Sequence, residues 1–413
     1  MKQIRLTAPE TPIDATVHLP SSKSICNRAL IIRALTPGCP MPGNLSDCDD
    51  TQVLLHALQT PTPEINIGAA GTAMRFLTAL LASTPCGTHL LTGTERMQQR
   101  PIRILADALR ALGADIDYAG KEGYPPLRII GKTLQGGTVS LPGNVSSQYI
   151  SALLLIAPTL AQGLTLTLTD EIVSLPYIDL TLGLMRQFGA QCAWVGDNRI
   201  RVEPQPYRPT PYFIESDWSA ASYWYEIMAF APEGSEIALP HLQENSLQGD
   251  AEVEHLFGES LNVETKHAGN GVTLQKTEER DSHWEADFVN QPDLAQTFVV
   301  ACALLGTTFS FTGLQSLKIK ETDRITALVT EMKKLGYVLT ETDGRTLSWD
   351  GTRCTPQENP VIDTYDDHRM AMAFAPAAFK VKGLRINHPE VVSKSYPHYW
   401  DDLHTVGFTL SEA

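Results

Sequence analysis

A repeat of about 74 residues organises this chain and limits the folds that are open to it. Each unit begins with a small or polar residue, continues with about ten apolar residues, and reaches a short β-rich run after a Pro or Gly break. Five of the apolar stretches begin at residues 72, 147, 219, 293 and 367, which are 75, 72, 74 and 74 residues apart. Spacing as regular as this is typical of repeated supersecondary units.

Most units also contain a second amphipathic segment that ends near a glycine. Apolar residues recur there at three- and four-residue steps, which predicts a helix followed by a strand. The segments are residues 102–118, 180–195, 324–340 and 399–410. An earlier apolar stretch, Ser24–Leu35, begins only 48 residues before the one at 72, so its unit should lack strands that other parts of the chain supply. The pattern predicts an α/β fold with six repeats. The repeats could form the six blades of one ring or two lobes of three repeats each, and the repeat length is compatible with both arrangements.

Composition excludes several classes of protein. The 413 residues are 43% hydrophobic and 19% charged, which favours two or three domains with sizeable cores. A formal charge of −15 argues against binding to nucleic acid or an anionic membrane, although a local group of Lys and Arg could still bind an anionic small molecule. The first twenty residues lack a signal-peptide apolar stretch, and the seven irregularly spaced cysteines indicate neither a disulfide framework nor a zinc site. We expect a reduced, soluble, cytoplasmic protein.

Several predicted helix starts in the first half carry groups that suit an anion. Residues 20–28 (PSSKSICNR) combine serine hydroxyls and two cations with the free N–H groups of a helix N-terminus. Residues 68–75 (GAAGTAMR) are small enough to let a ligand approach the backbone. Ser146, Ser147 and Gln148 begin the third helix. Ordinary capping and tight turns explain each of these motifs about as well when it is taken alone.

The second half concentrates its charges in two motifs. Residues 318–324 (KIKETDR) precede an amphipathic helix, and residues 365–373 (YDDHRMAMA) place Arg369 at the head of an apolar helix. A buried arginine needs a partner, whereas Asp293, at the matching position of the fifth repeat, would most often be just a helix cap. If equivalent helices direct their N-termini at one cleft, these weak motifs combine into one anion-binding site.

Together these motifs resemble the 5-enolpyruvylshikimate-3-phosphate synthase family, the enolpyruvyl transferases of the shikimate pathway. The resemblance follows family order over about residues 20–400 and is most specific in KETDR and DHRMAM. It rests on SSKSICNRAL, GAAGTAMRFL, LTGTERMQQRPI, VSSQYISALL, SLPYIDLTL, KIKETDRI, TYDDHRMAMAF and VVSKSYPHYW.

The resemblance implies the two-lobed enolpyruvyl transferase fold, an inside-out α/β barrel with six βαβαββ repeats arranged three per lobe. Residues 19–214 would form the N-terminal lobe, and residues 1–18 with 215–413 the C-terminal lobe, joined by two crossover segments. The first strand would then belong to the C-terminal lobe, which would account for the short first interval. The active site would lie in the interdomain cleft.

The activity implied is transfer of the enolpyruvyl (carboxyvinyl) group of phosphoenolpyruvate to the 5-hydroxyl of shikimate 3-phosphate, with release of phosphate. Addition followed by elimination would pass through a tetrahedral intermediate, on the route to chorismate and the aromatic amino acids. The family implies no cofactor and no metal. We expect a monomer whose partners are these two small molecules, without nucleic acid or membrane.

The resemblance also implies roles for individual residues. Asp293 is expected to act as the base for the hydroxyl, Glu321 to move protons at the methylene carbon, and Lys23 to stabilise developing charge. The residues expected to bind shikimate 3-phosphate are Lys23, Ser24, Arg28, Ser146, Ser147, Gln148, Ser174, Tyr177, Asp293, Ser316 and Lys320. Those expected to bind phosphoenolpyruvate are Lys23, Gly71, Arg100, Gln148, Arg324, Arg369 and Lys394.

Some positions depart from the family pattern. The usual Asn before Ala-Gly-Thr is Ala69 and the usual Pro after Met-Arg is Phe76; both would flank the phosphoenolpyruvate pocket, so affinity there and sensitivity to glyphosate-like inhibitors are open. An Asn commonly found before the KETDR motif is Ser316, which weakens one expected contact. Residues 258–284 look unlike the family and receive no function.

Two rival functions remain. The UDP-N-acetylglucosamine enolpyruvyl transferases share the fold and use a mobile-loop cysteine as an acid, but neither Cys39 nor Cys86 lies in such a motif here, and the DHRM motif favours the shikimate enzyme. A non-catalytic anion-binding protein is the second rival. The presence of Asp293, Glu321 and Lys23 together argues against it.

Overall fold

The computed structural model describes residues 2–60 and 62–412, apart from the side chains of residues 278–280. The chain divides into two compact units. Unit 1 takes in the chain up to Pro20 and from Glu215 onward, and unit 2 is Ser21–Ile214. Nowhere in the described chain is a helix both long enough and apolar enough to cross a membrane.

One repeat of unit 1 shows the building plan most clearly. The order along the chain is strand, helix, strand, helix, strand, strand, and the sheet order is β14-β15-β17-β16. The first two strands are parallel, and the remaining pairs are antiparallel. The elements are β14 (His283–Asp287), α10 (Ala295–Leu305), β15 (Thr308–Thr312), α11 (Arg324–Lys334), β16 (Thr340–Thr342) and β17 (Thr346–Trp349).

The last repeat of unit 1 is completed by the first strand of the chain. β1 (Gln3–Thr7) lies between β19 and β20, where β17 lies in the preceding repeat, and it is antiparallel to both. The N-terminal strand therefore closes the C-terminal sheet. The other elements are β18 (Val361–Ile362), α12 (His368–Phe374), β19 (Arg385–Asn387), α13 (Tyr399–Thr405) and β20 (Thr409–Glu412).

The remaining repeat of unit 1 is interrupted in sequence by the whole of unit 2. β2 (Asp14–Thr16) precedes unit 2 and pairs in parallel with β11, which follows it. Residues 258–284, which looked unlike the family, mainly form the two later strands of this sheet, where the register shifts between Leu261 and Val263. The other elements are α8 (Trp218–Phe230), β11 (Glu236–Pro240), α9 (Val253–Ser260), β12 (Leu261–His267) and β13 (Gly271–Arg280).

Unit 2 follows the same plan with one reduced repeat. Its sheets have the orders β3-β4-β6-β5 and β7-β8-β10-β9, again with a parallel first pair. Among the described residues, the repeat that contains α1 and α2 has an isolated β-bridge between Gly43 and Phe213 in place of a four-stranded sheet. The short first interval in the sequence predicted that this repeat would lack strands. The helices are α1 (Lys23–Ala34), α2 (Asp49–Gln59), α3 (Gly71–Ser83), α4 (Glu95–Gln98), α5 (Arg103–Ala111), α6 (Ser147–Ile156) and α7 (Leu175–Gln187). The strands are β3 (Glu64–Asn66), β4 (Thr88–Thr92), β5 (Asp115–Tyr118), β6 (Leu127–Ile130), β7 (Gly137–Pro142), β8 (Leu164–Thr169), β9 (Cys192–Trp194) and β10 (Arg199–Val202).

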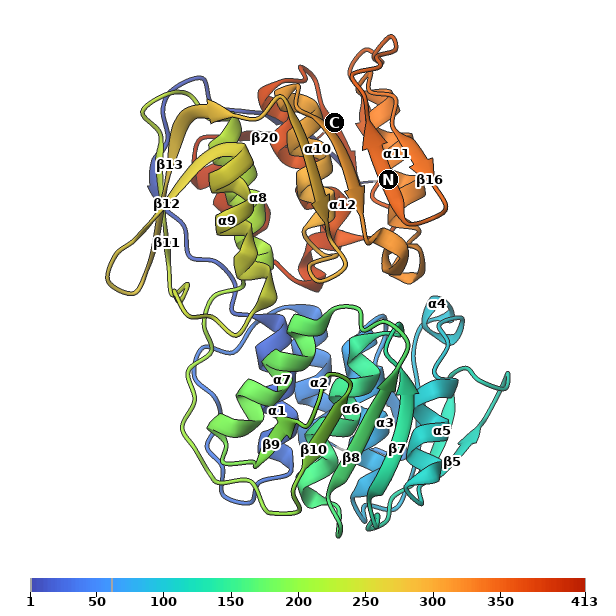
Figure 1. The fold of residues 1–413 in the computed structure, drawn as a ribbon. Coiled ribbons are helices and arrows are strands. Elements are labelled where there is room, and N and C mark those ends of the chain that lie inside the picture. The colour runs from blue at the N-terminus through green and yellow to red at the C-terminus, as the bar shows by residue number, and fades with distance from the viewer. Residues whose placement is uncertain (1, 61, 413) are drawn as a thin grey trace. The chain divides into compact units, whose positions relative to one another are not determined.

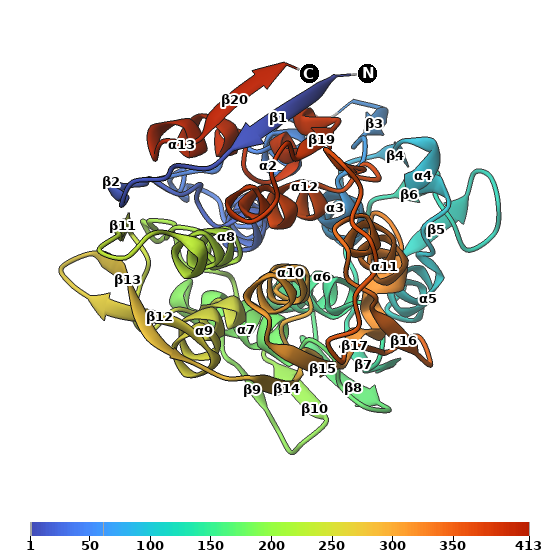
Figure 2. The same ribbon diagram turned by 90° about the horizontal axis from the view of Figure 1, so that it is seen from above.

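The predicted α/β repeat is confirmed. Helices α3, α6, α8, α10 and α12 begin within two residues of the five predicted starts. They are apolar all round because they are interior helices: α8, α10 and α12 pack on one another at the centre of unit 1, with the sheets outside them (Figures 1 and 2). Four of the second helices, α5, α7, α11 and α13, end at glycines, and Gly113, Gly189, Gly336 and Gly407 all have the left-handed φ of a C-terminal cap.

Two fully buried glutamates of unit 1 have different surroundings: one lies in an ion pair, and the other has no hydrogen-bond partner among the described residues. Glu331 in α11 pairs with Nζ of Lys334 at 2.7 Å and accepts hydrogen bonds from the hydroxyl of Tyr365 at 2.6 Å and the N–H of Asp363 at 3.1 Å. Glu226 in α8 has no hydrogen-bond partner for either carboxylate oxygen among the described residues. Burial raises the pKa of Glu226 well above its usual range, so the folded protein keeps this side chain protonated.

Replacing Glu226 by Gln should therefore stabilise the protein in a pH-dependent way. Above about pH 4.3 the unfolded chain ionises Glu226 while the folded chain does not, so the wild type loses stability as pH rises. We expect Glu226→Gln to raise the free energy of unfolding at pH 8, and to raise it by less at pH 5. Urea unfolding at the two pH values measures the difference.

Glu331→Gln is the matched control, because it removes the same charge from a paired site. It should destabilise the protein by about 3 kcal/mol, since it leaves Lys334 without its buried partner. An equal gain in Glu226→Gln at both pH values, or no gain at pH 8, would show that Glu226 is not held neutral by the core.

Candidate active site

Arg324 is the centre of a charged cluster in unit 1. It is the first residue of α11, after Asp323, whose side chain caps the helix by accepting the N–H of Thr326. The guanidinium lies deep in the unit, at 1% exposure, and contacts three carboxylates. Its Nε is 2.7 Å from Oδ2 of Asp367, its Nη1 is 3.0 Å from Oδ1 of Asp293, and its Nη2 is 3.1 Å from Oε2 of Glu321. Burial alone would lower the pKa of Arg324, but these carboxylates raise it above its ordinary value.

Asp293 serves this cluster and does not cap a helix. It lies two residues before α10, whose first turn has no side-chain cap, so the capping interpretation is wrong. Its carboxylate accepts from Arg324 and, at 2.9 Å, from Nη2 of Arg369; Nζ of Lys320 lies 3.4 Å away. A carboxylate held by two arginines and a lysine has a fixed position and direction.

Arg369 has the partner that its burial demands. It is the second residue of α12, and its guanidinium donates to Asp293 and, through Nη1, to the hydroxyl of Tyr223 at 3.2 Å. Burial raises the pKa of Tyr223 to about 12, so the phenol stays neutral beside the arginine. Two of the three arginines that the sequence assigned to phosphoenolpyruvate, Arg324 and Arg369, therefore share one carboxylate.

Asp367 is a member of the cluster that sequence reasoning missed. Its fully buried carboxylate bonds Arg324 twice, with Oδ1 also 3.2 Å from Nη2, and it caps α12 by accepting the N–H of Arg369 at 2.9 Å. One side chain thus orients the guanidinium of Arg324 and the helix that carries Arg369. The signal was present in the sequence, because an Asp directly before an apolar helix is a typical cap.

Glu321 and Lys394 complete the cluster. Nζ of Lys394, at the end of the short helix Pro389–Lys394, lies 3.6 Å from Oε1 of Glu321, whose other oxygen faces Arg324. The cluster thus joins four cations to three carboxylates, a formal charge of +1 that favours an anion. Its members are Lys320, Arg324, Arg369, Lys394, Asp293, Glu321 and Asp367.

Two further side chains of unit 1 bear on this site. Ser316, in the turn of helix Leu314–Ile319, has a buried hydroxyl that finds no hydrogen-bond partner in the part of the chain that the structure describes. Asp250, which the sequence did not single out, is buried and accepts the hydroxyl of Ser219. Burial raises the pKa of Asp250 to about 6, and the charge of Asp293 adds to the rise while Arg369 opposes it.

The predicted residues of unit 2 gather at the starts of its interior helices, beginning with α1. Ser22 caps this helix through the N–H of Ile25, and Lys23 is held by Asp50, with 3.5 Å between Nζ and Oδ2. Asp50 was not predicted.

Arg28 lies inside unit 2 and binds three helices. Its Nε donates to Thr181 at 2.7 Å and its Nη2 to Ser151 at 3.0 Å, while Nη1 donates to the carbonyl of Ser24 at 2.9 Å. A further contact reaches the carbonyl of Tyr177. Burial lowers the pKa of Arg28 to about 10. The contacts with Ser24 and Tyr177 fix the backbone of two residues that were predicted to bind shikimate 3-phosphate.

Two arginines lie close to Gly71 at the start of α3. A Cβ at Gly71 would lie 2.9 Å from Nη1 of Arg100 and 2.9 Å from Nη1 of Arg75. Arg75 also donates to the carbonyl of Gly71 at 2.9 Å, and its guanidinium lies over the ring of Tyr149. Sequence reasoning named the motif but not Arg75, which lies one helical turn after Gly71.

The starts of α6 and α7 hold the remaining predicted side chains of unit 2. Ser146 caps α6, with the N–H of Gln148 3.4 Å from its hydroxyl, and Gln148 donates to the hydroxyl of Thr72 in α3 at 3.0 Å. Ser147 is the first residue of α6. Ser174 has a left-handed φ of 56° before α7, and its carbonyl accepts the N–H of Tyr177.

The two departures expected to flank the phosphoenolpyruvate pocket, Ala69 and Phe76, occupy different surroundings. Ala69 is exposed in the turn before α3. Phe76 is buried, and the guanidinium of Arg28 lies 5.5 Å from the centre of its ring. Phe76 therefore packs against Arg28.

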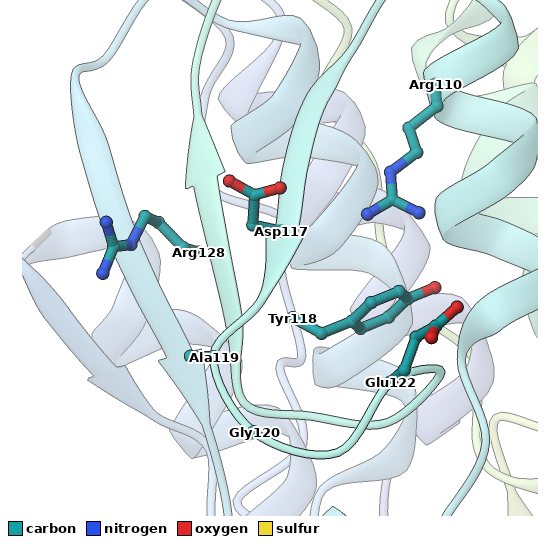
Figure 3. Close-up of a pocket in the computed structure, with 7 residues that line it drawn as sticks. All are labelled: Arg110, Asp117, Tyr118, Ala119, Gly120, Glu122 and Arg128. Carbon is teal, nitrogen blue, oxygen red and sulfur yellow. The ribbon is translucent and has the colours of Figure 1, made fainter.

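A cavity of about 460 Å³ lies elsewhere in unit 2, beside β5 and β6 (Figure 3). None of its seven lining residues is a predicted site residue. Two of its charged groups are engaged with the protein: Arg110 bonds Asp107 and the carbonyl of Ile116 and stacks on Tyr118, while Glu122 pairs with Arg103. We assign this cavity no part in the site.

Comparison with known proteins gives a consistent result. The family model for EPSP synthase (3-phosphoshikimate 1-carboxyvinyltransferase) matches residues 57–403. The 3-phosphoshikimate 1-carboxyvinyltransferase of Bacteroides fragilis is 60% identical over 405 residues, which cover 98% of this chain and 98% of that protein. That of Photobacterium profundum is 36% identical over 428 residues, covering 96% and 97%.

The solved structure of EPSP synthase from Acinetobacter baumannii has the same fold, with a TM-score of 0.77 at 22% identity over 100% of both chains. The repeats described above are therefore those of the two-lobed enolpyruvyl transferase fold. On the family model and the relatives, this chain belongs to the EPSP synthase (3-phosphoshikimate 1-carboxyvinyltransferase) family.

Proposed function

We propose that this chain transfers the enolpyruvyl group of phosphoenolpyruvate to the 5-hydroxyl of shikimate 3-phosphate and releases inorganic phosphate. Family membership supports the reaction. The main support for the assignment of residues is that Asp293 holds both Arg324 and Arg369 at fixed positions. Glu321 and Lys394 lie beside them.

We assign the binding of phosphoenolpyruvate to the cations Arg324, Arg369 and Lys394 of unit 1 and to a set of residues in unit 2. The carboxylate and phosphate of phosphoenolpyruvate match the planar forks of Arg324 and Arg369, and Lys394 adds a point charge. From unit 2 we assign Gly71, Arg100, Gln148 and Lys23. The support there is that α3 begins at a glycine with two arginines beside it, which leaves the helix N-terminus open to an oxyanion.

Shikimate 3-phosphate is assigned to hydroxyl, amide and cationic groups. The buried hydroxyl of Ser316 supports its assignment despite the change from Asn, because a ligand oxygen would give it a partner. Arg28 is proposed to act mainly by fixing Ser24 and Tyr177. The full set is Lys23, Ser24, Arg28, Ser146, Ser147, Gln148, Ser174, Tyr177, Asp293, Ser316 and Lys320.

The chemistry follows from the positions of two carboxylates. Asp293 accepts the proton of the 5-hydroxyl group while the hydroxyl oxygen forms a bond to C2 of phosphoenolpyruvate. C3 of phosphoenolpyruvate takes up a proton in the same step. The resulting ketal then loses phosphate from C2 and a proton from C3, which leaves the enol ether. Glu321 is proposed to carry the C3 proton in both steps, and Lys23 to balance the charge that develops on oxygen.

All residues in this proposal come from one chain, so the proposed site needs no second copy and we propose that the monomer is active. Light scattering during size-exclusion chromatography, with activity measured across the peak, tests this point.

Phosphate release separates the proposal from its rivals. The purified protein should release phosphate from phosphoenolpyruvate when shikimate 3-phosphate is present, and not when UDP-N-acetylglucosamine replaces it. Turnover with the UDP-sugar alone would contradict the proposal. Binding of shikimate 3-phosphate without turnover would instead indicate the non-catalytic rival.

Glu321→Gln should lower kcat by ~10²-fold or more, the usual scale of general acid–base catalysis. The matched control is Glu341→Gln, which removes the carboxylate of an outlying ion pair with Lys318 in the same unit and should leave kcat unchanged. Steady-state kinetics with both substrates measure the effect. A kcat within twofold of the wild type would remove Glu321 from the mechanism.

Ala69→Asn should change the Michaelis constant for phosphoenolpyruvate more than that for shikimate 3-phosphate, because it adds a hydrogen-bonding group to the turn before Gly71. Ala161→Asn makes the same change at another exposed position of unit 2 and should alter neither constant. If Ala69→Asn shifts both constants equally, residue 69 does not border the phosphoenolpyruvate site.

A further inference from the structure

The turn that delivers Asp367 to Arg324 is held in an unfavourable conformation. Its central residues, Tyr365 and Asp366, have φ of 54° and 55°, and the N–H of Asp367 bonds the carbonyl of Thr364 at 2.8 Å. Turns with two left-handed residues normally use Asn or Gly, because a bulky side chain is strained there. A tyrosine at the first position therefore needs surrounding contacts that enforce the turn.

Those contacts come from Glu331, on the same helix as Arg324. The fully buried carboxylate of Glu331 accepts the hydroxyl of Tyr365 at 2.6 Å and the N–H of Asp363 at 3.1 Å. Nζ of Lys334 holds both Glu331, at 2.7 Å, and Asp363, at 2.8 Å. The chain before the strained turn is thus tied to α11 by a paired, buried charge.

The other side of the turn is tied to α11 as well. Asp367 bonds Arg324, which lies seven residues before Glu331, so both anchors are on one face of the helix, two turns apart. The strained residues Tyr365 and Asp366 lie between the anchors. Asp367 also caps α12, the helix that carries Arg369. A turn that loosens would therefore displace both Arg324 and Arg369.

We propose that Glu331 and Tyr365 are positioning residues, which hold the 364–367 turn against its strain so that Asp367 keeps Arg324 and the start of α12 in place for the anionic substrate. The effect on the substrate rests on the proposed function. The effect on the turn does not, so the two parts can fail separately.

Tyr365→Phe tests the proposal, with Tyr225→Phe as the matched control. Both variants lose one tyrosine hydroxyl hydrogen bond in unit 1, since Tyr225 bonds Thr265 at 2.7 Å in a different repeat. We expect Tyr365→Phe to raise the Michaelis constant for phosphoenolpyruvate by about 5- to 10-fold, which corresponds to the loss of one typical intramolecular hydrogen bond. The constant for shikimate 3-phosphate and kcat should stay within about twofold to threefold, and Tyr225→Phe should change none of these.

Hydrogen exchange on the ligand-free protein provides a readout that does not depend on activity. The amides of Asp367 and Arg369, which bond Thr364 and Asp367, should exchange at least ~10-fold faster in Tyr365→Phe than in the wild type, and at the wild-type rate in Tyr225→Phe. Adding Asp366→Gly to Tyr365→Phe should restore protection and the Michaelis constant, because glycine adopts the left-handed conformation without strain.

Unchanged exchange at Asp367 and Arg369 in Tyr365→Phe would overturn the positioning role, whatever the activity. Faster exchange with an unchanged Michaelis constant for phosphoenolpyruvate would overturn its link to the substrate. If the wild-type protein fails to release phosphate from phosphoenolpyruvate at all, the proposed function falls while the exchange result still decides the role of the turn.

Discussion

A buried guanidinium whose charge must be balanced is the constraint on which unit 1 depends. Arg324 is removed from water, and its ion pairs with Asp367, Asp293 and Glu321 are what make that burial tolerable. Each of these carboxylates also makes a second contact, since Asp293 holds Arg369, Asp367 caps α12, and Glu321 faces Lys394. Satisfying one buried charge thus fixes the groups to which the proposed mechanism assigns substrate binding and proton transfer.

The repeated fold places these groups without long loops. In the last two repeats of unit 1 the first helix is interior and its start follows a strand, so Asp293 before α10 and Asp367 before α12 reach the same guanidinium at the start of α11. An acidic chain with a formal charge of −15 can therefore offer a cluster of formal charge +1. Local arrangement, and not overall charge, decides which ligand the protein attracts.

The repeat spacing predicted the interior helices to within two residues because an apolar helix and its period are local properties. The parallel pairing of β2 with β11, across the whole of unit 2, depends on contacts between distant residues that no local pattern reveals. The site shows the same division. Arg369 was recognised because a buried arginine needs a partner, whereas Asp293 resembled a cap in the local sequence and was named as a base only through the family resemblance. Asp367 received no role, since only the folded chain shows which carboxylates meet which cations.

The most direct test of this account is the affinity for phosphoenolpyruvate in Arg324→Lys, measured by titration in the presence of shikimate 3-phosphate. Lysine keeps the charge but cannot hold Asp367, Asp293 and Glu321 at once or present a planar fork. The account predicts a folded protein whose affinity for phosphoenolpyruvate falls by ~10²-fold while that for shikimate 3-phosphate changes by less than about threefold. Wild-type affinity for phosphoenolpyruvate in this variant would contradict it.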